Sequence, residues 1–282
     1  MIRESRATRV VILTGSELRH DFFRKAVSLA QDIAVLRSYT EGLEGTLRTT
    51  IDSARPGSAL QLRHLSLRDR SERDFFGSFV ALAPDRSNVL AIPRGTVNEP
   101  LVISEIETLG PDLILAFGPS LVREPLLSRY AGRFVNIHLG LSPYYVGSGT
   151  NFWPLVNAEP EFVGATFMHI DAGIDDGAIL HQIRARIYPE DGPHQIGNRL
   201  IADMVCATIH LVRHFDELGP GVTPNRPPTA RTYRKKDFTA EAVETLYANF
   251  RTGLAERYEA ERSVRIARAP LHEHAMFAGW NP

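Results

Sequence analysis

The fold is decided by Asp112-Leu113-Ile114-Leu115-Ala116-Phe117-Gly118-Pro119-Ser120, an apolar run that ends in a glycine-proline turn. A run without polar alternation is typical of a parallel strand that is buried on both faces. The turn after it would lie at the carboxyl edge of the sheet, where open α/β proteins bind their ligands. This stretch therefore predicts an α/β sheet with a binding site at that edge.

The residues before this stretch alternate between strand and helix patterns. Residues 10–13 and 33–36 predict strands on either side of a helix, and residues 89–92 predict a third strand before a helix that Pro100 opens. The alternation predicts a doubly wound, mostly parallel sheet. Residues 41–87 are rich in charge, and we expect a solvated helix over about residues 70–82 whose charges lie on the surface.

The residues after the central run predict three more strands, at 134–138, 163–170 and 178–187, of which the last two form an antiparallel pair. A helix is expected over residues 194–215, a proline- and glycine-rich linker over 219–228, another helix from about residue 239, and a weakly patterned tail. We expect a catalytic domain at residues 8–190. A C-terminal helical extension and tail at residues 191–282 would pack back on it and offer a homodimer interface.

The composition excludes several classes of protein. The 282 residues are 43% hydrophobic and 23% charged, as in ordinary globular proteins. A formal net charge of -1 gives no overall field to attract nucleic acid or an anionic membrane. No apolar run approaches the roughly 20 residues that span a bilayer. The single cysteine, Cys206, is expected in the core, and together with a polar N-terminus it favours a cytoplasmic setting.

Chemically active side chains follow the central run. In Phe134-Val135-Asn136-Ile137-His138, the amide of Asn136 and the imidazole of His138 alternate along one predicted strand and so share a face. The glycine-interrupted loop Asp171-Ala172-Gly173-Ile174-Asp175-Asp176-Gly177 lies between the next two predicted strands. We predict that the amide, the imidazole and a carboxylate of this loop form one site.

Each motif by itself has a simpler interpretation. An isolated N-x-H at a strand end is more often structural than catalytic, and the aspartate loop by itself could be an ordinary turn. Calcium is disfavoured because the acidic ligand spacing of an EF-hand is missing. His169 and His181 flank the loop, but no matching cysteine or histidine cluster accompanies them, so no metal is expected.

The two motifs together resemble the formyltransferase family that uses 10-formyltetrahydrofolate, which includes the methionyl-tRNA, glycinamide ribonucleotide and sugar N-formyltransferases. The shared pattern is N-x-H, a short loop to Pro143, and then a D-x-x-x-D-x-G loop. The resemblance covers about residues 10–187. It implies a Rossmann-like formyltransferase fold, 10-formyltetrahydrofolate as formyl donor, and catalytic roles for Asn136, His138 and Asp175.

The chemistry of formyl transfer agrees with these roles. An Asn136 N–H can stabilise the oxyanion that forms during transfer. His138 can donate to that oxyanion if protonated, or take a proton from the attacking amine if neutral. Asp175 can favour the imidazolium, orient the ring or assist proton transfer through water. The sequence does not decide which of these roles His138 and Asp175 play.

The resemblance also implies binding residues. Two loops are expected to contact the folate, with these members: Phe117, Gly118, Pro119 and Leu121 in the first, and Ile170, Asp171, Gly173 and Ile174 in the second. The acceptor pocket is expected to include Tyr144, Ser148, Thr150 and Trp153, although core packing competes as the role of Trp153. The basic residue that often precedes the loop glycine in this family is Val146 here, which weakens the inference of phosphate or nucleic-acid binding.

We therefore expect transfer of a formyl group to an amine of a small metabolite, such as an amino sugar nucleotide or an amino-acid derivative. The residues after Pro228 predict too little strand for the C-terminal barrel of a methionyl-tRNA formyltransferase. Three alternatives remain: a formyltetrahydrofolate hydrolase that releases formate, a methionyl-tRNA formyltransferase-like enzyme without the barrel, and a folate-binding protein without catalysis.

Overall fold

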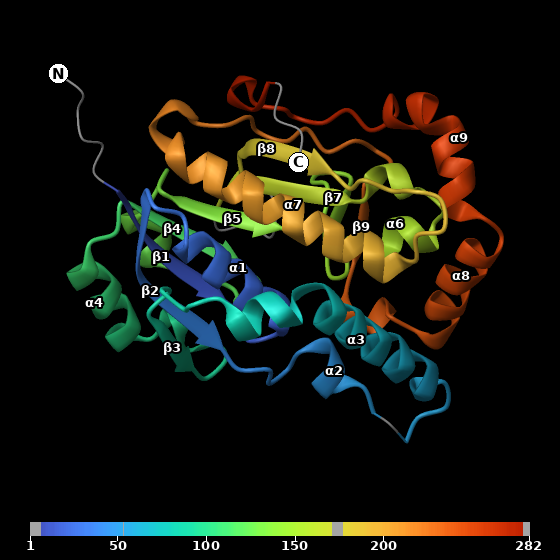
Figure 1. The fold of residues 1–282 in the computed structure, drawn as a ribbon, viewed down its shortest axis with the longest axis horizontal. Coiled ribbons are helices and arrows are strands. Elements are labelled where there is room, and N and C mark those ends of the chain that lie inside the picture. Colours follow the sequence, from blue (N-terminus) through green and yellow to red (C-terminus); the bar gives the residue numbers. More distant parts are fainter. Residues whose placement is uncertain (1–6, 53, 171–176, 279–282) are drawn as a thin grey trace.

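A computed structural model describes residues 7–52, 54–170 and 177–278. In this part of the chain a seven-stranded sheet has the order β3-β2-β1-β4-β5-β7-β8 (Figure 1). The first five strands are parallel, and β7 and β8 run antiparallel, so the predicted doubly wound sheet and antiparallel pair are confirmed. The strands are β1 (Thr8–Thr14), β2 (Ile33–Glu41), β3 (Val89–Ile92), β4 (Leu113–Phe117), β5 (Phe134–His138), β7 (Gly164–His169) and β8 (Ile179–Arg184).

Helices cover both faces of the sheet because its central strands are apolar on both sides. In β1, Val10 and Ile12 pack into one core, whereas Val11 and Leu13 pack into the other. The first core is shared with α1, α3 and α7, and the second with α4 and α5 (Figure 1). The helices are α1 (Leu18–Ser28), α2 (Leu47–Thr50), α3 (Ser58–Leu82), α4 (Pro100–Leu109), α5 (Leu126–Arg129), α6 (Trp153–Val156), α7 (Pro193–Arg213), α8 (Ala240–Arg251) and α9 (Leu254–Ile266).

The direction of winding reverses between β1 and β4. From β1 the chain moves outward to β2 and β3, and from β4 it moves the other way to β5. The loops after β1 and β4 therefore diverge, which opens a crevice at the carboxyl edge of the sheet. The N-x-H strand, β5, borders this crevice.

The helix in the charged segment is longer than predicted. α3 begins at residue 58 rather than near residue 70, after Gly57 at a φ of 83°. Polar residues interrupt the apolar stripe over its first turns, so its helical periodicity is weak in the sequence. Packing against α1, α7 and α8 supports it instead.

The C-terminal region also differs from its prediction. The segment after Pro143, where the sequence predicts no strand, contains β6 (Tyr145–Gly147), which pairs in parallel with β9 (Arg231–Tyr233). Strands of three residues carry no readable periodicity, and only the fold brings these two together. α9 lies partly in the predicted tail, where its exposed charges hide a short apolar face of Leu254, Ala255 and Tyr258.

The C-terminal helices pack against the catalytic core. Residues of α7, α8 and α9 belong to the same buried cluster as β1 and β4, and Figure 1 shows α8 and α9 beside α6. The expected helical extension that packs back is thus present, while a boundary at residue 190 stays a prediction. Cys206 is exposed, contrary to expectation, because its neighbours Met204, Val205 and Ala207 occupy the buried side of α7. Among the described residues, no helix is long and apolar enough to cross a membrane.

Candidate active site

Strand β5 presents Asn136 and His138 at the edge of the crevice. Asn136 lies between Ala116 of β4 and Met168 of β7, and His138 pairs with Thr166. The intervening strand residues are buried in the core, whereas Asn136 and His138 are only half-buried. This alternation puts the amide and the imidazole on one face of β5, as the sequence predicts.

A cavity of about 710 Å³ opens in front of these two side chains. Its size is in the range of small-molecule sites, and it extends along the carboxyl edge from the loop after β2 to the loop after β5. The predicted site residues that line it are Phe117, Gly118, Pro119, Leu121, Asn136, His138, Ser148, Thr150, Trp153 and Ile170. Asp171, Gly173, Ile174 and Asp175 lie outside the described residues.

Two predicted acceptor residues have structural contacts of their own. The Tyr144 hydroxyl donates to the carbonyl of Pro270 at 2.8 Å, and this residue is not part of the cavity wall. Trp153 stacks on Tyr233 with ring centroids 4.0 Å apart, and its indole N–H donates to the Ser148 carbonyl at 3.0 Å. Trp153 therefore packs into the structure while one edge reaches the cavity.

The loop that follows His138 is held by buried hydrogen bonds. The Thr166 hydroxyl donates to the Gly140 carbonyl at 2.7 Å and accepts from the Ser142 N–H at 3.1 Å. The Gln182 amide donates to the Ser142 carbonyl at 2.6 Å and to Thr166 at 3.0 Å. Because Thr166 and Gln182 are buried, these bonds fix the backbone next to His138.

The loop after β4 is held by one buried carboxylate, that of Glu41. It is 1% exposed at the end of β2, and it accepts from the backbone N–H and the hydroxyl of Ser120 and from the Gly95 N–H. Three strand-end loops thus meet at one side chain. The position of the predicted folate loop depends on this carboxylate.

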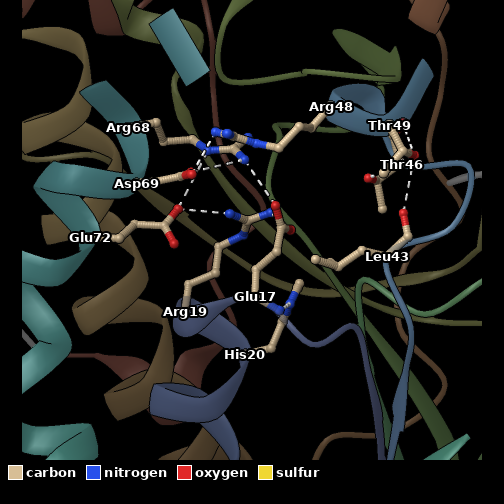
Figure 2. A network of polar contacts seen from close by, with 10 residues as sticks. All are labelled: Glu17, Arg19, His20, Leu43, Thr46, Arg48, Thr49, Arg68, Asp69 and Glu72. Carbon is tan, nitrogen blue, oxygen red and sulfur yellow. Dashed lines mark hydrogen bonds and ion pairs between the residues drawn. The ribbon is translucent and has the colours of Figure 1, made fainter. Parts of the chain in front are cut away.

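The opposite wall of the cavity is an ion network (Figure 2). Arg19 on α1 contacts Glu72 at 2.7 Å and also Glu17, while Arg68 on α3 contacts Glu17 at 2.9 Å and Asp69 at 3.6 Å. Burial by itself would lower the pKa of Arg19, but Glu72 and Glu17 raise it overall. Glu72 is 4% exposed, so the expectation that this segment carries only surface charges is wrong. Folding two helices together buries charges that appear solvated along the sequence.

His20 lines the cavity, and its ring lies between two glycines. A Cβ atom on Gly15 would come within 2.8 Å of its ring, and one on Gly118 within 2.6 Å, so both loops need glycine to accommodate the ring. The Glu17 backbone N–H donates to Nδ1 at 3.1 Å, which places the ring proton on Nε2. Burial, followed by the nearby charge of Arg19, keeps the pKa of His20 well below its usual value. The cavity is thus lined by another imidazole, that of His20, whose neutral form is favoured by burial and which the sequence motifs did not indicate.

A further pair of histidines lines the cavity where α3, α7 and α8 meet. His64 contacts the Tyr247 hydroxyl at 3.0 Å, and the same hydroxyl lies 3.4 Å from His194. Burial lowers the pKa of His64 to about 3 and that of His194 to about 4. Arg234 and Lys235 also reach the cavity from the segment after the linker. No sequence signal connects these residues, because they come from α3, α7, α8 and the segment after the linker.

The described ranges 7–52, 54–170 and 177–278 contain no group of three or more histidine, cysteine or acidic side chains arranged to hold a metal ion. The wall instead combines amides, imidazoles and charged side chains, most of the carboxylates being paired with arginines. Such groups can stabilise an oxyanion and move protons.

Comparison with known proteins identifies the family that this site belongs to. The family model for formyl transferase matches residues 68–209, about half of the chain and the part that carries Asn136 and His138. The chain therefore belongs to the formyl transferase family, and the resemblance noted from its motifs is confirmed.

Solved structures of formyltransferases share this fold at low sequence identity. Phosphoribosylglycinamide formyltransferase from Anaplasma phagocytophilum is 14% identical, with a TM-score of 0.52 over 81% of this chain and 99% of that one. Glycinamide ribonucleotide transformylase 1 from Symbiobacterium toebii is 16% identical, with a TM-score of 0.52 over 79% and 97%. A sugar N-formyltransferase from a Shewanella species is 18% identical, with a TM-score of 0.50 over 82% and 78%.

Proposed function

We propose that this protein transfers the formyl group of 10-formyltetrahydrofolate to an amine of a small metabolite, with Asn136, His138 and Asp175 as its catalytic residues. The observation that carries this proposal is the placement of Asn136 and His138 side by side on β5, facing a cavity of about 710 Å³. Membership in the formyl transferase family supports the reaction type.

The chemistry follows from the groups in the wall. As the attacking amine approaches the formyl carbon, negative charge develops on the formyl oxygen. The Asn136 amide can donate a hydrogen bond to that oxygen, and such donors typically contribute about 10²- to 10³-fold in rate. The adjacent imidazole of His138 can accept the proton that the amine loses and return it to the folate nitrogen as the bond between that nitrogen and the formyl carbon breaks, so that tetrahydrofolate leaves. Asp175, which lies outside the described residues, is proposed to favour the imidazolium that forms when His138 has taken up this proton.

The cavity has suitable features for a folate. Phe117, Leu139 and Ile170 provide apolar wall next to Asn136, as an aromatic pterin ring requires. Gly118, at a φ of 74°, lets the backbone after β4 approach a ligand closely, and Glu41 holds that loop. We propose that these residues hold the folate, which supplies the formyl carbon.

The acceptor would then occupy the other part of the cavity, toward α1 and α3. Arg19 and Arg68 are already paired with carboxylates there, so this wall does not present an excess of positive charge. We propose a small amine as the acceptor, with amino sugar nucleotides and amino-acid derivatives as the first classes to test. Arg94, Arg234 and Lys235 also line the cavity, so its lining as a whole carries positive charge that suits a small anionic acceptor. A long polyanion such as tRNA is disfavoured because the formal net charge of -1 gives the protein no overall field to attract it.

The experiment measures tetrahydrofolate release from 10-formyltetrahydrofolate with and without a panel of amino sugar nucleotides and amino-acid derivatives. Amine-dependent release, with the formylated amine detected by mass spectrometry, is the expected result. Release at the full rate without any amine would instead identify a hydrolase.

The site assignment is tested with Asn136→Ala, His138→Gln and Asp175→Asn. We expect each to lower kcat by about 10²- to 10³-fold, as for the loss of an oxyanion donor or a general base. His214→Gln is the matched control, because His214 lies on the surface, paired with Glu217 at 3.2 Å. Full activity in all three site variants would refute the assignment.

A further inference from the structure

The hydroxyl of Thr150 contacts the ring of His138 inside the cavity wall. Its Oγ1 lies 3.1 Å from His138 Nε2, and it also donates a hydrogen bond to the Leu139 carbonyl. Thr150 is 3% exposed, so water does not compete freely for these contacts. Thr150 thus contacts the end of β5, from which a loop of some ten residues separates it in sequence.

These two contacts determine where the ring proton lies. A threonine hydroxyl has one proton, and a carbonyl oxygen can only accept. The short contact with Leu139 therefore uses the hydroxyl proton, since two oxygens without a proton between them would repel. The remaining partner of Oγ1 must then be a donor, which requires a proton on His138 Nε2.

We propose that Thr150 is a positioning residue that fixes His138 as the Nε2–H tautomer, so that the ring gains and loses its catalytic proton at Nδ1. The neutral form of a histidine carries one proton, and the second can be added only to the other nitrogen. The tautomer of His138 does not depend on the proposed function, whereas the catalytic role of Nδ1 rests on it. The inference fixes which nitrogen of His138 would act as the base: Nδ1, and not Nε2, would accept the proton of the amine.

Gly140 makes this contact possible. A Cβ atom at this position would lie 2.5 Å from Thr150 Oγ1 and 2.6 Å from His138 Nε2. Either distance is too short for non-bonded atoms, so an alanine would push the hydroxyl and the ring apart. The glycine therefore allows Thr150 and His138 to meet, and it provides an independent way to separate them.

The test is nuclear magnetic resonance of the full chain with histidines labelled at the ring nitrogens, without substrates, at a pH where His138 is neutral. The chain has ten histidines, and the His138 signals are those that disappear in His138→Gln. We expect the wild type and Thr150→Ser to show the Nε2–H tautomer, since serine keeps the hydroxyl. Thr150→Val and Gly140→Ala should both shift the ring toward a mixture of tautomers, while the signals of surface His214 stay unchanged.

Kinetics provide the second measurement. We expect Thr150→Val to lower kcat about tenfold, with a smaller change in KM for either substrate, and Thr150→Ser to restore most of the rate. A wild-type ring in the Nδ1–H form would overturn the proposal, and so would identical His138 spectra in wild type, Thr150→Val and Gly140→Ala. The tautomer is measured without turnover, so failure of the proposed function would leave this result intact and distinguishable.

Discussion

Glu41→Gln is the substitution for which the structure gives the clearest expectation. One carboxylate oxygen accepts from Gly95 N–H at 2.9 Å and from Ser120 Oγ at 2.7 Å. The other accepts from the Ser120 backbone N–H and lies 3.8 Å from an Arg94 nitrogen. Glutamine has the same shape, but one of its two terminal atoms is an NH₂ group that can only donate.

The magnitude follows from that geometry. If the amide oxygen faces Gly95, the NH₂ group points at the Ser120 N–H and at Arg94, and one charge-assisted hydrogen bond is lost. Such bonds contribute about 1.5–3 kcal/mol, and leaving a buried N–H without an acceptor costs about 1–3 kcal/mol. We expect the free energy of unfolding to fall by about 2–4 kcal/mol. The loop after β4 should also loosen, which raises KM for 10-formyltetrahydrofolate more than it lowers kcat.

Urea denaturation and steady-state kinetics measure the two effects. The matched control is Glu44→Gln, a nearby exposed glutamate, for which we expect a change within about 0.5 kcal/mol and an unaltered KM. If Glu41→Gln matches this control in both measurements, the carboxylate does not hold the loop and the reasoning is wrong.

Three further predictions concern the walls of the cavity. Glu72→Gln should lower the free energy of unfolding, measured by urea denaturation, by about 1.5–3 kcal/mol, because it removes one of the two carboxylates that pair with Arg19. Thr166→Val keeps the side-chain shape but removes three buried hydrogen bonds, so urea denaturation should show a loss of about 2–4 kcal/mol. In the folded protein the pKa of His64 is lowered to about 3 and that of His194 to about 4, whereas in the unfolded chain both rings have the ordinary value of 6.5. As the pH falls below 6.5, the unfolded chain therefore takes up protons on these two rings before the folded protein does. Stability should therefore decrease between pH 6.5 and 4, by at most about 1.4 kcal/mol per pH unit for each ring, and a double phenylalanine variant should flatten that slope in pH-dependent urea denaturation.

The central sheet could be predicted from sequence because its signals are local. The apolar run of β4 and the alternation of β5 each lie within a few adjacent residues, and burial on both faces of a parallel strand produces such runs directly. The N-x-H motif could be predicted for the same reason, since two alternate residues of one strand share a face whatever the rest of the chain does.

The second wall of the cavity could not be predicted, because its members are distant in sequence. Arg19 and Glu72 look like surface residues until α1 packs against α3. Likewise β6 and β9 are too short to show a period, and only their pairing defines them as strands. Whether a charge is buried in an ion pair, or a three-residue segment forms a strand, is decided by the neighbour that tertiary folding brings to it.

By itself, the sequence determined the sheet, the strand that carries Asn136 and His138, and the family to which the chain belongs. Those features depend on the spacing of residues that are close together in the sequence, so the sequence alone contains the information. Only the tertiary structure showed that His20 faces the crevice as a neutral ring, that Glu41 holds the loop after β4, and that Thr150 returns to contact His138. Each of these depends on a hydrogen bond between segments that meet only when the hydrophobic cores of the sheet close around them.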